Sequence, residues 1–81
     1  MTAHFSLNDL NRCIAQHLGC DNASIAGQLR LVEDLAIDSL GMHALLIDIE
    51  EAGGHIPPPG ALEHVSTVAD LFEAVAAAAP S

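Results

Sequence analysis

The stretch Leu31-Val32-Glu33-Asp34-Leu35-Ala36-Ile37-Asp38-Ser39-Leu40 decides the fold of this chain. Its first seven residues are mostly apolar but follow no helical period, whereas the residues after Leu40 do. Asp and Ser are residue types that cap helices, because their side chains accept hydrogen bonds from backbone N–H groups. The stretch therefore predicts a loop that packs on the core and turns into a helix at Ser39. In the first turn of that helix, unpaired N–H groups and a partial positive charge would favour a phosphate ester on the Ser39 hydroxyl.

The helix that starts at Ser39 is predicted to span residues 39–52. Its buried stripe repeats at helical spacing and consists of Met42, Leu45, Leu46 and Ile49. The acids of this helix lie off the stripe, and Gly53-Gly54 supplies a stop, because glycine readily takes the left-handed conformation past a helix end.

A capping box predicts another helix near the start of the chain. Ser6 and the acid three residues later, Asp9, can each accept a hydrogen bond from the other's backbone N–H. The helix is expected over residues 7–18 and ends at Gly19. Residues 19–37 then form a loop whose apolar residues return repeatedly to the core.

A second capping box, Thr67 with Asp70, predicts a final helix that stops before Pro80. A short third helix is expected over residues 61–65, after the stiff Pro57-Pro58-Pro59 connection. No alternating pattern of β-branched residues predicts a strand. The fold class is all-α: a four-helix bundle with a long loop between helices one and two and a short third helix.

The composition limits what such a chain can do. Eighty-one residues predict a single domain, residues 1–81, and only Phe5 and Phe72 are aromatic, so the core is aliphatic. Eleven acids against Arg12 and Arg30 give a net charge of −9, which argues against nucleic acid or an anionic membrane as a partner. An acidic domain is instead steered toward enzymes with basic patches.

The two cysteines have no spacing suited to zinc, and no metal site is expected. Residues 1–6 contain no basic segment followed by an apolar run, so no secretory signal is predicted. We expect a monomer in a reducing cytoplasm, with Cys13 and Cys20 both free.

These features together resemble the acyl carrier protein family. Its signature is a Leu-x-x-Asp-Leu approach, an Asp-Ser-Leu triplet and an apolar helix that ends in paired acids. The matching segments are Leu31 to Leu35, Asp38-Ser39-Leu40, Glu50-Glu51 and, near the end, Thr67-Val68-x-Asp70-Leu71. The resemblance extends from about residue 7 to residue 75.

The resemblance implies that Ser39, between Asp38 and Leu40, carries 4′-phosphopantetheine, whose thiol holds acyl groups as thioesters. It implies a carrier with no catalytic residue of its own. The implied partners are a phosphopantetheinyl transferase, an acyltransferase or ligase that loads the carrier, and a ketosynthase or other acyl-processing enzymes. Partner docking would use the acids Asp34, Asp48, Glu50 and Glu51. The cargo would be lined by Met42, His43 and Leu46.

The sequence departs from the family pattern at several positions. Ala36 stands where glycine is common, His43 where an aliphatic residue is usual, and Ala44 where a docking glutamate is usual. After the helix, Gly53-Gly54 replaces the usual aromatic residue, and prolines replace the acids that usually follow Ile-Pro. We expect His43 to be partly buried and to border the apolar interior that a cargo would enter. The departures predict a dedicated carrier in polyketide or other specialised-metabolite biosynthesis, rather than one for the usual enzymes of fatty acid synthesis.

Three other kinds of protein could share some of these features. Ser39 and His43 are four residues apart, as a nucleophile and base could be, but there is no Gly-x-Ser-x-Gly elbow and no orienting acid for a hydrolase. A helical interaction module without the cofactor is opposed by the intact Asp38-Ser39-Leu40. A peptidyl or aminoacyl carrier more often has Gly-Gly-x-Ser-Leu, so Ile37-Asp38 favours the acyl type.

Overall fold

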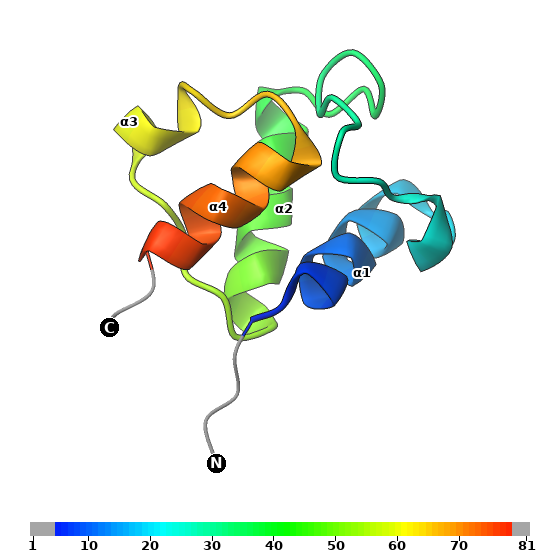
Figure 1. Cartoon of the computed structure of the whole chain (residues 1–81), viewed down its shortest axis with the longest axis horizontal. Coiled ribbons are helices and arrows are strands. Elements are labelled where there is room, and N and C mark those ends of the chain that lie inside the picture. The colour runs from blue at the N-terminus through cyan, green and yellow to red at the C-terminus, as the bar shows by residue number, and fades with distance from the viewer. Residues whose placement is uncertain (1–4, 79–81) are drawn as a thin grey trace.

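The computed structural model describes residues 5–78, which fold into four α-helices and one short 3-10 turn (Figure 1). In chain order the elements are α1 (Leu7–Leu18), η1 (Asn22–Ser24), α2 (Ser39–Glu51), α3 (Pro59–Leu62) and α4 (Val68–Ala78). The described residues contain no strand, and a single isolated bridge pairs Arg30 with Thr67. The predicted all-α bundle, with its long loop and short third helix, is confirmed.

Both predicted capping boxes are present. Ser6 Oγ accepts a hydrogen bond from the Asp9 N–H at 3.2 Å, and Asp9 Oδ2 accepts one from the Ser6 N–H at 2.9 Å. Thr67 and Asp70 make the same exchange at 3.1 and 3.2 Å. Backbone hydrogen bonds to the carboxylate lower the pKa of Asp9 and of Asp70, because they stabilise the charged form. Each box therefore supplies partners for N–H groups that the helix itself leaves free.

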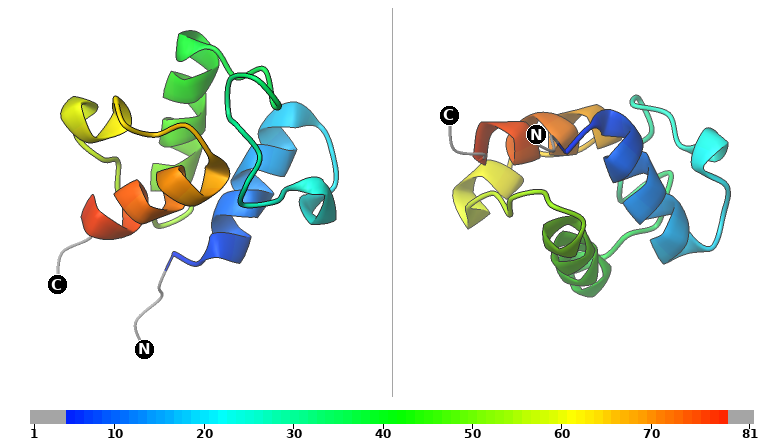
Figure 2. Two further views of the ribbon diagram at one scale, coloured as in Figure 1. Left: turned by 45° about the horizontal axis from the view of Figure 1, so that its top comes forward. Right: turned by 90° about the horizontal axis from the view of Figure 1, so that it is seen from below.

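The loop of residues 19–38 packs across the bundle and is fixed to the start of α4 by backbone hydrogen bonds. The Leu31 N–H donates to the Ser66 carbonyl at 2.8 Å, and the Val68 N–H donates to the Leu29 carbonyl at 3.0 Å. Figure 2 shows the loop passing beside α1 and the start of α4 before it joins α2. The loop thus brings Ser39 to one end of the bundle on a fixed path.

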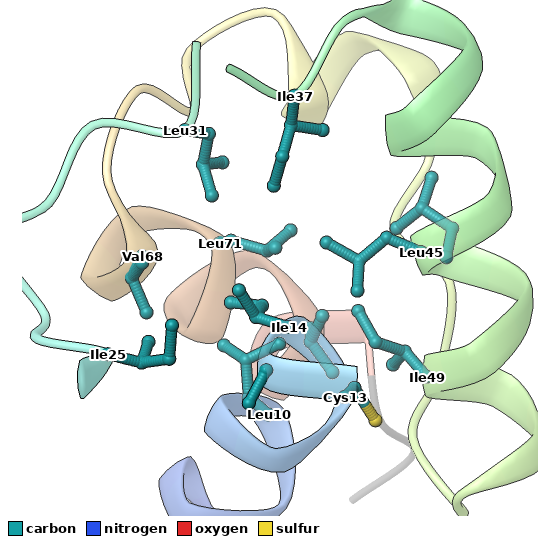
Figure 3. Packing of buried hydrophobic residues seen from close by; sticks show 13 residues of the cluster. Leu10, Cys13, Ile14, Ile25, Leu31, Ile37, Leu45, Ile49, Val68 and Leu71 are labelled. Atoms are coloured by element: carbon teal, nitrogen blue, oxygen red, sulfur yellow. The ribbon is translucent and has the colours of Figure 1, made fainter. Parts of the chain in front are cut away.

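Aliphatic side chains from three helices and the loop converge in one core (Figure 3). α1 contributes Leu10 and Ile14, and α2 contributes Leu45 and Ile49, all of them completely buried. The buried residues of this core cluster are Leu10, Cys13, Ile14, Ala15, Ile25, Leu31, Ile37, Leu45, Leu46, Ile49, Val68, Leu71 and Val75. No polar or charged side chain among residues 5–78 is buried with them. Burial of this surface is the main stabilising contribution to the fold.

The helix ends differ from the predictions at two places. α2 ends at Glu51 and Ala52 caps it, one residue earlier than predicted. α3 spans Pro59–Leu62 rather than residues 61–65, because proline is favoured at the first position of a helix, where it needs no N–H partner. The predicted stop before Pro80 falls outside the described residues.

None of the helices within residues 5–78 has both the length and the apolar character needed to cross a bilayer. The His, Cys, Asp and Glu side chains of the same residues form no group of three that would hold a metal ion.

Candidate functional site at the head of helix α2

Asp38 caps helix α2 as the sequence predicts. Its backbone is extended, with φ −85° and ψ −176°, and its Oδ1 accepts a hydrogen bond from the Gly41 N–H at 2.7 Å. Its carbonyl accepts from the Met42 N–H at 2.8 Å, which is the first helical bond of α2. Ser39 is therefore the first helical residue, and it is exposed to solvent.

The Ser39 hydroxyl differs from most other described hydroxyls in having no structural role. Ser6 Oγ, Ser66 Oγ and Thr67 Oγ1 all take part in the hydrogen bonds that cap α1 and α4. The Ser39 hydroxyl makes no side-chain hydrogen bond to any part of residues 5–78. Among these four side chains, only that of Ser39 is free to react without loss of a helix cap.

The approach to Ser39 is held in a tight turn. Asp34 Oδ2 accepts a hydrogen bond from the Arg30 N–H at 2.8 Å, and the Ile37 N–H donates to the Leu31 carbonyl at 2.9 Å. Within this turn Ala36 has φ 55°, a left-handed conformation that glycine takes readily and alanine does not. Alanine at this position therefore carries backbone strain directly before the site.

His17 of α1 lies next to the head of α2. The sequence analysis did not predict this approach. A Cβ atom added to Gly41 would lie 3.3 Å from His17 Nε2 and 3.2 Å from Asp38 Oδ1. Glycine at position 41 thus lets the end of α1 approach α2 closely. The sequence indicates only that His17 lies in the last turn of α1. Its distance from Gly41 depends on how the two helices cross, which is a tertiary feature.

The outer face of α2, defined here as Leu40, His43, Ala44 and Ile47, is exposed and carries no acid. Leu40 is 78% exposed and Ile47 is 42% exposed. In Figure 2 (right) the other elements lie on one side of α2 and leave this helix open on the opposite side.

The prediction that His43 is partly buried and borders the apolar interior is wrong, because its side chain is exposed. Met42 is half-buried against the core and Leu46 is buried, as predicted. A residue directly after Met42 is rotated by about 100° around a helix, which moves it off the buried stripe. The structure therefore gives His43 no contact with the interior.

The four predicted docking acids do not share one surface. Glu50 and Glu51 are exposed near the end of α2. Asp48 is half-buried and, with Glu51, lines an open cleft of about 370 Å³ against α1, where Asp9, Arg12, Cys13, Gln16 and Ala52 complete the lining. Asp34 lies in the turn before the site, and one of its oxygens already accepts the Arg30 N–H.

Cys13 connects the two walls of this cleft. Its thiol donates to the Asp48 carbonyl at 3.9 Å, and burial raises its pKa, with a smaller contribution from the nearby Asp48 charge. The thiol therefore stays protonated at neutral pH and acts as a small apolar group.

Comparison with known proteins agrees with this geometry. No protein-family model matches the chain. The chain is 34% identical over 58 residues to a curated acyl carrier protein of Thermotoga maritima, covering 72% of each chain. It is 36% identical over 63 residues to a curated acyl carrier protein of Syntrophobacter fumaroxidans, covering 78% of each chain. Identity of this extent over about three quarters of each relative, on a helical bundle with an exposed serine at the head of α2, assigns this chain to the acyl carrier protein family.

Proposed function

We propose that this chain is a discrete acyl carrier protein that tethers acyl intermediates as thioesters on 4′-phosphopantetheine at Ser39. The observation that carries the proposal is the exposed, uncommitted hydroxyl of Ser39 at the first position of α2. Membership in the acyl carrier protein family supports a carrier role over an enzymatic one.

The residues around Ser39 fit the phosphopantetheine group. A phosphodiester on Ser39 would lie in the field of the α2 N-terminus, which favours an anion. Asp38 Oδ1 accepts a hydrogen bond from the Gly41 N–H, and this bond stabilises the start of the helix. Leu40 projects into solvent beside the serine, where it can contact a transferase or an acyl-processing enzyme. The group itself supplies a flexible arm and a terminal thiol, and none of the chemistry at the thiol needs a side chain of this protein.

Loading requires one covalent step, performed by a phosphopantetheinyl transferase. A bond forms between Ser39 Oγ and the phosphorus atom next to the pantetheine of coenzyme A, while the pyrophosphate P–O bond of coenzyme A breaks. The leaving group is adenosine 3′,5′-bisphosphate, whose 5′-phosphate is the other half of the broken pyrophosphate, and the serine proton passes to a base of the transferase. Exposure of Ser39 on a capped helix end is what this reaction demands of the carrier.

The test is intact-mass analysis after incubation with coenzyme A, Mg²⁺ and a broad-specificity transferase. One phosphopantetheine should be added to the wild type and none to Ser39→Ala. Ser24→Ala is the matched control, because Ser24 is also an exposed serine and should not affect loading. Addition of the group to Ser24, Ser66 or Thr67 would overturn the assignment of Ser39.

Docking of partner enzymes is proposed to be electrostatic and to depend on the acids of α2. Glu50 and Glu51 are the exposed acids at its C-terminal end, and they support this role best. Asp48 and Asp34 contribute to the same negative field from the cleft and from the turn. Attraction between this field and a basic enzyme surface raises the association rate and weakens as salt rises.

Charge reversal with a matched control separates local docking from the field of the whole chain. Glu50→Lys and Glu51→Lys should each lower kcat/KM for loading by the transferase about two- to five-fold at low salt, the range expected for exposed charge pairs. Asp21→Lys changes the net charge equally, but Asp21 lies at η1, beside α1, and makes no capping hydrogen bond. An equal loss in Asp21→Lys would refute a docking role for α2.

We further propose that the carrier serves polyketide or other specialised-metabolite biosynthesis. Support comes from the acid-free outer face of α2, where Ala44 replaces the glutamate implied by the family resemblance. The test is malonyl transfer by the malonyltransferase of bacterial fatty acid synthesis. Ala44→Glu should raise kcat/KM about two- to five-fold over the wild type. No difference between the two would remove the support for a specialised pathway.

A further inference from the structure

His43 lies one helical turn beyond Ser39, and both side chains are exposed. α2 is continuous from Ser39 to Glu51, so the two residues form an i, i+4 pair with Cβ atoms about 5–6 Å apart. Side chains on a helix lean toward its N-terminus, which directs the imidazole of His43 back over the turn that begins with Ser39. The ring is therefore within reach of a group attached to the Ser39 hydroxyl.

His43 has no anionic partner among residues 5–78. The one ion pair in this part of the chain joins Arg12 to Asp9, within α1, at 3.9 Å. The neighbouring elements carry further titratable groups, and no carboxylate among them lies within 4.0 Å of the His43 ring nitrogens. They are Asp9, Arg12, Cys13 and His17 of α1, Cys20, Asp21, Arg30, Glu33, Asp34 and Asp38 of the loop, His55, Glu63 and His64 after α2, and Asp70 and Glu73 of α4. On α2 itself the acids are Asp48, Glu50 and Glu51, the first of them five residues beyond His43. A phosphodiester on Ser39 would lie one helical turn from His43, on the same exposed side of α2.

The chain offers few other cations for that phosphodiester. It contains no lysine, and its two arginines are Arg12, which pairs with Asp9, and Arg30, which lies in the loop beside Thr67. The other imidazole near the head of α2 is that of His17, which reaches Gly41 from α1. Asp38 next to Ser39 is acidic, and its carboxylate would repel a phosphate. An imidazolium at position 43 would offset this repulsion from the side of the helix where Ser39 is exposed.

Resting on the proposed function, we propose that His43 is a binding residue for the phosphodiester of the arm on Ser39. Its protonated ring pairs with the phosphate across one helical turn and holds the root of the arm along the outer face of α2. A role in binding the phosphodiester replaces the predicted cargo-lining role of His43, because a cargo-lining ring would have to border the interior.

The pairing predicts a shift that can be measured on the histidine itself. An anion beside an imidazole favours the protonated form and therefore raises its pKa. An i, i+4 ion pair has a strength that corresponds to a rise of about 0.2–0.4 pKa units. The rise should occur when the arm is added to Ser39 and should be absent from Ser39→Ala treated in the same way.

The experiment is a pH titration of the unloaded and loaded protein by NMR, after the mass of each sample has been verified. The ring proton signals of His43 should show the rise, while His55 and His64, which are exposed on other segments, serve as internal references. The ³¹P signal of the loaded protein is a second readout. A phosphodiester has no ionisation of its own near neutral pH, so an inflection at the pKa of His43 reports the neighbouring ring.

Two variants make the test specific. His43→Asn should remove the inflection from the ³¹P titration, and because the side chain is exposed the variant should fold normally. In the double variant His43→Ala/Ala44→His the imidazole moves about 100° around the helix, and its pKa should not rise on loading.

The outcomes separate this inference from the proposed function. If the transferase adds no arm to Ser39, the carrier assignment and the role of His43 fail together. If the arm is added and the pKa of His43 does not move, the role of His43 is refuted while the carrier function stands. An equal rise at His55 and His64 would also refute it, because it would reflect the added charge rather than a local pair.

Discussion

Replacing Ala36 with glycine should stabilise the protein, although it removes a methyl group and contributes no new contact. Ala36 has φ 55°, and the left-handed conformation costs an L-residue about 1–2 kcal/mol. Glycine avoids that cost. It also makes the unfolded chain more flexible, which lowers the free energy of unfolding by about 0.4–1 kcal/mol. The net gain in the free energy of unfolding is about 0.5–1 kcal/mol, and Tm should rise by about 2–8 °C for a domain of this size.

Ala44→Gly is the matched control for this prediction, since it is the same chemical change at another exposed position. Ala44 lies in the middle of α2, where glycine costs about 1 kcal/mol, so Tm should fall by about 4–8 °C. Both variants can be compared with the wild type by thermal and urea unfolding followed by circular dichroism. A fall in Tm for Ala36→Gly would refute the left-handed conformation of Ala36 and the strain inferred from it.

Three further changes test the core, a cap and the cysteines. Leu45→Ala, at a completely buried position, should cost about 2–5 kcal/mol and lower Tm by about 8 °C or more, and an unchanged Tm would contradict the core assignment. Hydrogen bonds from the Ser66 and Thr67 N–H groups lower the pKa of Asp70 in the folded protein. Its contribution to stability is therefore complete above its ordinary value of 3.8 and decreases as pH falls from there through the lowered pKa. Asp70→Asn should lower Tm more at pH 7 than at pH 3, and a pH-independent difference would refute this. Iodoacetamide should label only exposed Cys20 in the folded protein and both thiols in urea, because burial raises the pKa of Cys13; rapid labelling of folded Cys20→Ser would contradict this.

The helices could be predicted because their signals are local. Ser6 with Asp9 and Thr67 with Asp70 satisfy N–H groups within a few residues, and the structure contains both exchanges. α3 was misplaced by two residues because a four-residue helix has too short an apolar pattern to outweigh the starting preference of Pro59.

The packing at the end of α2 could not be predicted in the same way. Gly54 was expected only as part of a helix stop, yet it is buried, and a Cβ there would lie 2.6 Å from a methyl group of Ile49 and 3.1 Å from the ring of Phe5. Ile49 is local, but Phe5 lies 49 positions away in the sequence, and no local pattern contains its contact with position 54.

The site was predicted in part. The cap by Asp38 and the exposure of Ser39 follow from the types of residue at the start of a helix. The error at His43 came from its apolar neighbours in sequence, which lie on another side of the helix. His17 was missed because its approach to Gly41 depends on how α1 and α2 cross.

The most direct test of the central claim is the intact mass of the protein purified from its native host, combined with fragmentation that locates any added group. We predict a mass above that of the bare chain by one phosphopantetheine, free or acylated, with the whole addition on Ser39. The bare mass alone, or an addition on any other residue, would contradict the assignment of this chain as a phosphopantetheine-bearing acyl carrier.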